Sequence, residues 1–324
     1  MKKSNNALSL YVLVKRNITL YMKDRMTVMF SVLAPIIVLL IYILFLGDLQ
    51  VESISGMLGE YGLEGVLQKS DIQALINNWM IAGVMGVSCV TVAINANIVM
   101  VRDKMNGSIN DILASPVKRW VIYASYIISC FLITFCICLI VLLLSIVYLA
   151  ATGGLMLSFV DFLSIFGSTI LSTLSSAFLA TLICSFIKST GTLAALNGIF
   201  GTAMGFLIGA YLPFSMMPKF MQYMACFIPG TYSAGLFRNF FLKGVLSNFS
   251  AKLPPESNII ETLMENYSIR LELFGTEISA GYMALALIFA IVLFASLLLI
   301  FYSNKKTNFF AVGKKRKKAK SKRK

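Results

Sequence analysis

The residue types that most often carry catalytic or metal chemistry are scarce in this chain. Among its 324 residues there is no histidine, which removes the commonest general base and the commonest transition-metal ligand. Its 6 cysteines show no Cys-x-x-Cys pairing and lie mostly inside long apolar runs, which is typical of packing residues. No Gly-x-x-x-x-Gly-Lys-Ser/Thr loop is present to hold a nucleotide phosphate. The sequence therefore predicts no catalytic residue, no metal site and no cofactor-binding site in this chain.

Three acidic residues leave one enzyme hypothesis open. Glu60, Glu64 and Asp71 lie in one polar segment, where carboxylates could act as a general acid and base. No histidine, metal-ligand spacing or nucleophile motif accompanies them. A membrane enzyme is thus an alternative, and alanine at all three positions would test it.

The most distinctive polar stretch is Asp103–Pro116, with the sequence DKMNGSINDILASP, between two long apolar runs. A loop that only joined two membrane spans would need fewer polar residues. We predict a short amphipathic helix here, with a turn at Gly107, an N-cap at Ser108 and a stop at Pro116. The apolar face that docks on a cytoplasmic partner would consist of Ile109, Ile112 and Leu113.

The elements that must position this stretch are membrane helices. The chain is 58% hydrophobic and only 13% charged, with a mean hydropathy of +0.83, which places it among polytopic membrane proteins. About 20 apolar residues suffice for a helix to cross the hydrocarbon core. Six uncharged windows reach that length: Met26–Gly47, Ile72–Val101, Trp120–Val160, Phe162–Ile187, Ser189–Pro218 and Ile278–Asn304. We therefore predict an all-α membrane protein with six transmembrane helices.

A seventh candidate span, Phe220–Phe237, is rejected on two grounds. The pair Pro229-Gly230 at its centre would break it into halves too short to cross, so two short re-entrant or external helices are expected between spans 5 and 6. Six spans with a cytoplasmic N-terminus also place most of the 28 Lys and Arg residues in the cytoplasm, as the positive-inside rule requires. We predict a multi-pass protein of the plasma membrane with both termini cytoplasmic.

This topology divides the chain into three parts. Residues 1–26 would form an amphipathic connecting helix at the cytoplasmic interface, residues 27–302 the six-span transmembrane domain, and residues 303–324 a polybasic tail. Within the membrane domain we expect an external loop over 48–71, the coupling segment over 102–119, and an external re-entrant region with an insert over 213–277. The basic residues of the connecting helix that would lie near anionic headgroups are Lys15, Arg16, Lys23 and Arg25.

Two asparagines near the cytoplasmic end of the second span need a polar environment. Asn95 and Asn97 are costly in lipid, so they should face protein or a water-filled path. Hydrogen bonding between helices and lining of a transport pathway are both open.

Two regions of the chain resemble type-2 ABC exporter permeases. The coupling helix of that family follows the pattern of acidic residues, Gly-Thr-Leu-Glu and Leu-Leu-x-Ser-Pro, and this sequence matches it at Asp103, Gly107, Ser108, Ile109, Leu113, Ser115 and Pro116. Met105 and Asn110 stand where family members more often have Glu. The region after the fifth span matches at Pro213, Pro218, Pro229, Tyr232 and Arg238, while Ile228 replaces the family's Asn.

The resemblance implies a transport subunit rather than an enzyme. Separate ABC ATPase subunits would bind ATP and Mg²⁺, dock on the coupling segment and touch the connecting helix. A second permease copy or a sister permease would complete the path. The uncharged spans favour a hydrophobic or amphipathic drug, antibiotic or lipid-like cargo, with polysaccharide or sodium export and a non-transporting scaffold or sensor as alternatives. The polybasic tail is expected to bind anionic lipid, not nucleic acid.

Overall fold

The computed structural model of the chain describes residues 5–63, 65–211, 213, 217–253, 259–269, 271–273 and 276–303. In chain order its elements are α1 (Asn6–Lys23), α2 (Arg25–Ile41), the π-helix η1 (Tyr42–Leu46), α3 (Gly47–Glu60), α4 (Lys69–Ala96), α5 (Ile98–Asn106), α6 (Ser108–Ala114), α7 (Arg119–Ala151), α8 (Phe159–Phe186), α9 (Thr190–Leu207), α10 (Lys219–Cys226), α11 (Pro229–Phe241), α12 (Lys243–Lys252), α13 (Ile259–Asn266), β1 (Leu271–Leu273), β2 (Thr276–Ile278) and α14 (Ala280–Ser303). The two strands pair antiparallel, with Glu272 opposite Glu277.

Among the described residues, 6 helical segments are long and apolar enough to cross a membrane, which confirms the predicted all-α membrane protein. They are Arg25–Phe45, Lys69–Asn106, Arg119–Ala151, Phe159–Phe186, Thr190–Leu207 and Ala280–Phe301. The second segment differs from its predicted window, because it continues past Val101 through the charged residues of α5. That extension carries the functional site described below.

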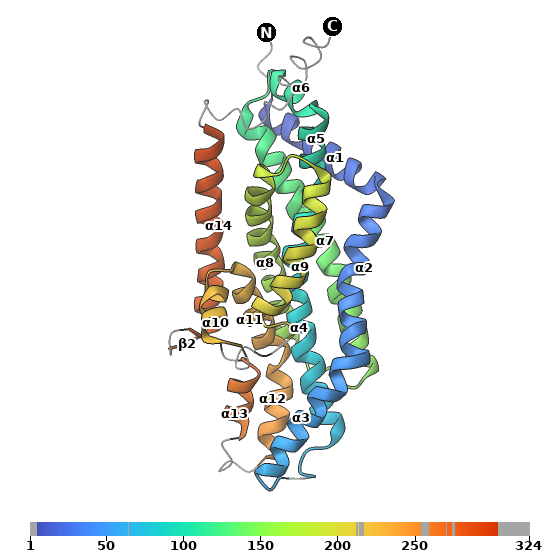
Figure 1. The fold of residues 1–324 in the computed structure, drawn as a ribbon, viewed down its shortest axis with the longest axis vertical. Coiled ribbons are helices and arrows are strands. Elements are labelled where there is room, and N and C mark those ends of the chain that lie inside the picture. The colour runs from blue at the N-terminus through green and yellow to red at the C-terminus, as the bar shows by residue number, and fades with distance from the viewer. Residues whose placement is uncertain are drawn as a thin grey trace.

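The helix at the centre of the bundle is α4, which contacts α7, α8, α9 and α11 (Figure 1). Its most apolar window has a mean hydropathy of 2.0 and is 83% buried, whereas the corresponding windows of α2 and α14 reach 2.9 and 3.1 and are only 17% buried. The less apolar helix therefore lies inside. Lipid gives no hydrophobic drive for helices to associate, so small and polar residues mark the protein-facing surfaces. At Gly86 an added Cβ would lie 2.8 Å from the Cβ of Ala234 in α11, so only glycine permits this close approach.

The two ends of the bundle carry different elements. Helices α1, α5 and α6 lie together at one end, and α3, α12 and α13 lie at the other (Figure 1). The segment predicted as an external loop over 48–71 is helical as far as Glu60, because η1 and α3 continue the first span without a break.

Of the three acidic residues in the enzyme hypothesis, Asp71 is held in contacts that stabilise the fold. Asp71 forms a capping box with Gln68 at the start of α4, and Lys252 of α12 donates to both of its carboxylate oxygens at 2.7 and 2.8 Å. Glu60 is exposed at the end of α3, and Glu64 lies outside the described residues. Asp71 therefore ties α12 to the central helix.

The rejected seventh span consists of two helices, α10 and α11, that meet at Phe227 and Ile228. Pro229 occupies the first position of α11, where its missing N–H costs no hydrogen bond. Helix α13 lies in the predicted insert. The polybasic run of the tail lies outside the described residues.

Candidate functional site

The polar segment forms two short helices that meet at Gly107. This residue adopts φ +82°, a left-handed conformation that glycine takes without steric cost, and it ends α5 and begins α6 at the same time. The prediction of Ser108 as the N-cap was wrong: Gly107 holds that position, and Ser108 is already the first helical residue. At the far end Ser115 is extended, as expected for a residue before proline, and Pro116 follows.

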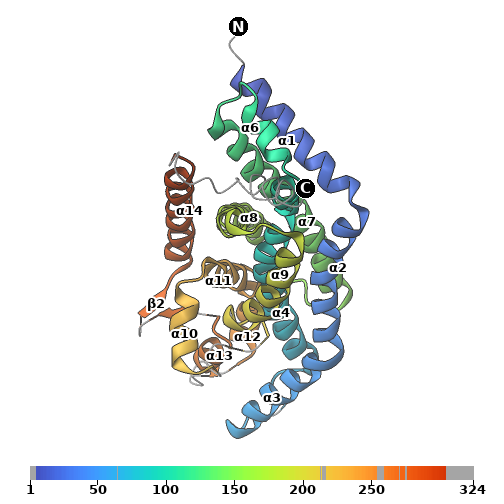
Figure 2. The ribbon, with the colours of Figure 1, turned by 45° about the horizontal axis from the view of Figure 1, so that its top comes forward.

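The apolar face of α6 is used inside the chain. Ile109 is fully buried, so its predicted part in a docking face was wrong. Ile112 and Leu113 are half-buried and pack against the same cluster of side chains. The reason is that α6 lies on the start of α7 (Figure 2), where its apolar side already has a partner. The exposed residues around this turn are Met105, Asn106, Asn110, Asp111, Ala114 and Pro116.

Asp103 forms a partly buried ion pair with the connecting helix. Arg16 of α1 donates to its two carboxylate oxygens at 2.7 and 2.8 Å, and the Tyr126 hydroxyl of α7 donates at 2.6 Å. The hydrogen bond to Asp103 raises the pKa of Arg16 above its ordinary value. The expectation that Arg16 reaches toward lipid headgroups was therefore wrong. A buried carboxylate needs donors, and these two side chains supply them.

Arg102, one residue earlier, pairs with Asp24 at the corner between α1 and α2. Asp24 also caps α2, since its carboxylate accepts a hydrogen bond from the Thr27 N–H at 3.1 Å. Both donors, Arg102 first, hold the pKa of Asp24 below its ordinary value. This pair fixes the corner against α5.

Lys104, one residue later, is buried against the end of α8. Its Nζ donates to the carbonyl oxygens of Cys184, Ser185 and Ile187 at 2.6, 2.9 and 3.2 Å. The last carbonyl groups of a helix have no partner in their own helix and carry a partial negative charge, so a buried ammonium group satisfies them.

We call Arg102, Asp103 and Lys104 the α5 charge triad. Consecutive residues of an α-helix point about 100° apart, so three in a row reach three different neighbours. Here these are the α1–α2 corner, the α1–α7 interface and the end of α8. The sequence prediction missed Arg102, Lys104 and Tyr126. The available signal was three adjacent charges immediately after an apolar span.

The other basic residues of the connecting helix face outward. Lys15, Lys23 and Arg25 are exposed. Contact of these three exposed side chains with lipid headgroups stays a prediction.

Asn97 belongs to helix packing. It donates to the Ala93 carbonyl at 3.0 Å and to the Cys130 sulfur of α7 at 3.1 Å, and it accepts from the Thr181 hydroxyl of α8 at 3.3 Å. It is almost fully buried, so the pathway alternative was wrong for this residue. Asn95 is half-buried, and its place in a pathway stays a prediction.

The proline-rich motif surrounds a second buried cation. Arg238 of α11 is fully buried, donates to the Gly209 carbonyl just after α9, and lies 5.2 Å from the ring centre of Trp79. Arg238 therefore satisfies a carbonyl group at the end of α9, as Lys104 satisfies carbonyl groups at the end of α8. In the same motif the Tyr232 hydroxyl donates to the Cys226 carbonyl at 2.8 Å across the α10–α11 break. Pro213 is buried, Pro218 precedes α10, and Pro229 opens α11.

A cleft of about 290 Å³ lies between α2, α4 and α9. No charged side chain of the described chain lines it, and its lining residues with polar groups are Ser88, Thr91, Asn197, Thr202 and Tyr211. Ser88 and Thr91 donate back to their own helix at 2.6 and 3.1 Å. The side-chain oxygen of Asn197 is inaccessible and accepts no hydrogen bond from the described residues. The cleft therefore has mostly apolar walls with a few hydroxyl and amide side chains among them.

The described residues include no group of three or more His, Cys, Asp or Glu side chains that could hold a metal ion. A family model described as ABC-2 type transporter matches residues 9–242 of the chain. No curated protein and no solved structure matches it. The matched range includes most of α1, the α5 charge triad, α6 and the whole proline-rich motif.

Proposed function

Because the chain belongs to the ABC-2 type transporter family and is a permease with six membrane spans, we propose that it exports a hydrophobic or amphipathic substrate across the plasma membrane. A separate ABC ATPase subunit would bind ATP and Mg²⁺ and supply the energy. The observation that carries this proposal is the α5 charge triad, which anchors α5 to three other parts of the bundle, directly before the short helix α6.

The triad gives α6 the properties of a coupling element. An ATPase that docks on the exposed side of α6, around Asn110 and Asp111, would move α5 with it across the single residue Gly107. Because α5 is tied to α1, α7 and α8 by ionic and charge-assisted hydrogen bonds, a displacement of α6 would shift these helices as one body. Lys188 is exposed in the turn between α8 and α9, close to Lys104, and offers a second contact at the same end.

We place the end that carries α1, α5 and α6 in the cytoplasm, with both termini on that side. The distribution of Lys and Arg in the sequence supports this orientation. We also propose that a second copy, or a sister permease, completes the transporter. The most apolar windows of α2 and α9 are only 17% buried within the chain, and small exposed residues follow one side of α9: Gly191, Ala195, Gly198 and Thr202.

The cleft between α2, α4 and α9 supports the proposed substrate class. It is apolar with hydroxyl and amide groups, and it opens beside the two poorly buried helices α2 and α9. A lipophilic molecule with one polar group would fit this space, with that group beside the amide of Asn197.

Coupling is tested by purifying the tagged chain from membranes and measuring the ATP hydrolysis that co-purifies. The test variant is Asp111→Arg/Ala114→Arg, which changes two exposed residues of α6 and none of the triad. The matched control is Glu60→Arg, an exposed change at the opposite end of the bundle. The wild type and the control should bring down the ATPase, and the α6 variant, still inserted in the membrane, should not. Equal recovery in all three would contradict the proposal.

Transport is tested separately from docking. In the reconstituted complex a lipophilic substrate should stimulate ATP hydrolysis. Asn197→Ala should raise the substrate concentration needed for half-maximal stimulation about fivefold or more, because one hydrogen bond to the substrate is lost in an apolar cleft. The variant should still bring down the ATPase. Absence of stimulation by any lipophilic compound in a complex that hydrolyses ATP would favour the scaffold alternative.

A further inference from the structure

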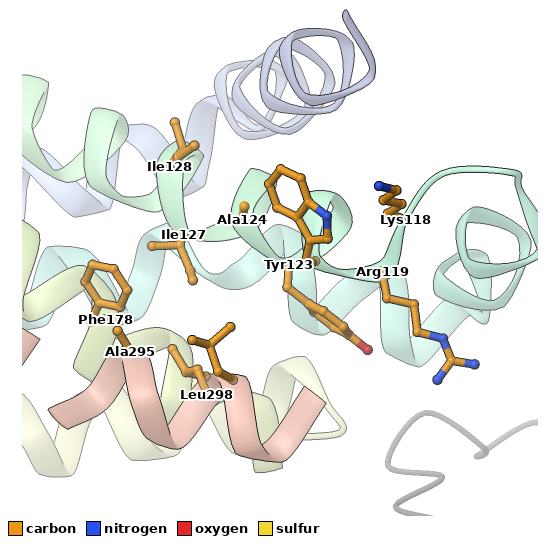
Figure 3. A pocket seen from close by; sticks show the side chains of 11 residues that line it. Lys118, Arg119, Tyr123, Ala124, Ile127, Ile128, Phe178, Ala295 and Leu298 are labelled. Carbon is orange, nitrogen blue, oxygen red and sulfur yellow. The ribbon is translucent and has the colours of Figure 1, made fainter. Parts of the chain in front are cut away.

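A second, larger hollow lies between α7, α8 and α14. It has a volume of about 760 Å³. Lys118 and Arg119 lie at one end of it, and Ile127, Phe178 and Leu298 line the other end (Figure 3). Trp120 also lines it, and this side chain is 52% exposed. We call this hollow the α7–α14 groove.

We propose that the α7–α14 groove binds an anionic phospholipid, with its phosphate at Lys118 and Arg119 and an acyl chain along Ile127, Phe178 and Leu298. The basic residues and the apolar walls belong to one continuous hollow, as the two parts of a phospholipid require. This site is distinct from the cleft between α2, α4 and α9, whose polar groups carry no charge.

The charge of the groove is of one sign. No acidic residue of the described chain lines it, and neither Lys118 nor Arg119 takes part in any of the ion pairs that the described residues form. By contrast, Arg16 and Arg102 at the same end are each neutralised by a carboxylate. A pair of cations without a carboxylate at the rim of an apolar groove selects a ligand that brings its own negative charge.

The length of the groove corresponds to one leaflet. From Arg119 to Ile128, the most distant α7 residues of its lining, the helix advances by about 14 Å at 1.5 Å per residue. Half of a hydrocarbon core about 30 Å thick is about 15 Å. The groove thus spans from the headgroup level to the bilayer centre. Trp120 lies at the headgroup end, the level at which tryptophan is enriched in membrane proteins.

The groove also faces the bilayer rather than the interior of the protein. One of its walls is α14, whose most apolar window is only 17% buried and which stands at the side of the bundle away from α2 (Figure 2). A lipid can therefore enter sideways, with its headgroup kept at the interface. With the proposed orientation, this leaflet is the cytoplasmic one, where anionic lipids contribute a negative surface potential. Binding of the lipid in the groove does not itself depend on that orientation.

The site lies next to the coupling element. Lys118 and Arg119 follow Pro116 by two and three residues, so a bound headgroup would hold the start of α7 beside α6. A lipid at this position would stabilise the surface on which α6 rests.

The test uses the fluorescence of Trp120 in the full-length chain reconstituted in nanodiscs. Brominated phosphatidylglycerol and brominated phosphatidylcholine are titrated over the same range of mole fractions. Bromine quenches tryptophan only at short range, so quenching reports lipid bound beside Trp120. A basic side chain near an anionic surface favours binding about fivefold, so two give a preference of about 25-fold at low ionic strength. Quenching by phosphatidylglycerol should therefore saturate at a much lower mole fraction, and added salt should reduce the difference.

Three variants make the result specific. Lys118→Gln/Arg119→Gln should bring the two lipids to within about twofold, while retained quenching by phosphatidylcholine shows that the groove is intact. Lys15→Gln/Lys23→Gln removes the same charge from the exposed side of α1 and should leave the preference unchanged. Trp120→Phe, which leaves only the buried Trp79, should abolish the headgroup-dependent signal.

Equal quenching by both lipids in the wild type would overturn the proposal. So would an equal loss of preference in the α1 control, which would assign the effect to the general positive charge of this end. The readout does not depend on an ATPase, a substrate or the direction of insertion. Its failure would leave the proposed transport function untouched, and failure of the co-purification experiment would leave the lipid site untouched.

Discussion

The partly buried pair between Arg16 and Asp103 should hold the connecting helix on the bundle with a measurable coupling energy. The perturbation is a double-mutant cycle of Arg16→Gln, Asp103→Asn and the combined variant. Both changes keep the approximate size of the side chain and remove its charge, so they probe the ion pair with little change in packing.

The expected magnitude follows from the geometry. Two unit charges about 4 Å apart attract by about 4 kcal/mol at an effective dielectric constant of about 20, and part of this is lost to desolvation. The Asp103 side chain is 8% exposed and the Arg16 side chain 32%, so solvent screens the pair from one side only. With two hydrogen bonds at 2.7 and 2.8 Å, we expect a coupling energy of about 1.5–3 kcal/mol. Each single variant should lower the free energy of unfolding by about 2–3 kcal/mol, and the double variant by less than the sum.

The assay is unfolding of the purified chain in mixed micelles with increasing denaturing detergent, followed by tryptophan fluorescence. The matched control is the same cycle on Asp24 and Arg102, whose side chains are 20% and 39% exposed. Pairs this exposed contribute about 0–1 kcal/mol, so the control should show weaker coupling.

Additive effects of Arg16→Gln and Asp103→Asn would refute the reasoning. Additivity would mean that each side chain is stabilised by other groups, such as Tyr126, and that α1 is not held by the pair. A coupling energy no larger than that of the Asp24–Arg102 control would lead to the same conclusion.

Three further measurements follow from the site. Gly107→Ala should lower the free energy of unfolding by about 1–2 kcal/mol through its backbone alone, since the nearest atom to an added Cβ is 3.9 Å away, and it should reduce ATPase co-purification. Gly167→Ala, with open space and an ordinary helical backbone in α8, should do neither. Lys104→Met should speed hydrogen exchange of the amides at the end of α8, and unchanged exchange would contradict the capping role. Arg102 holds the folded-state pKa of Asp24 below its ordinary 3.8. The stabilisation by this pair should therefore be constant above about pH 5 and should disappear as the pH falls through that lower pKa. The difference in unfolding free energy between wild type and Asp24→Asn, measured from pH 3 to 8, checks the sign.

Much of the architecture follows from the sequence because it depends on local composition. Apolar runs of sufficient length can only cross as helices, so six spans were predicted and six are found among the described residues. Proline acts on its own helix, so the break before Pro229 was also predictable. The short helix after Gly107 follows from the same local rules, since a polar stretch between two spans ends at Pro116.

The roles of individual side chains depended on the tertiary structure. Hydropathy does not tell which side of a helix meets a neighbour, so Arg16 was expected at the headgroups and Ile109 at a docking surface, whereas both contact the chain itself. The three carbonyl groups that bind Lys104 come from residues about 80 positions later in the sequence. Composition determined that this chain spans a membrane six times. Which charges are buried and paired was decided only by the packing of α1, α7 and α8 around α5, because a buried charge is stable only where distant segments supply its partner.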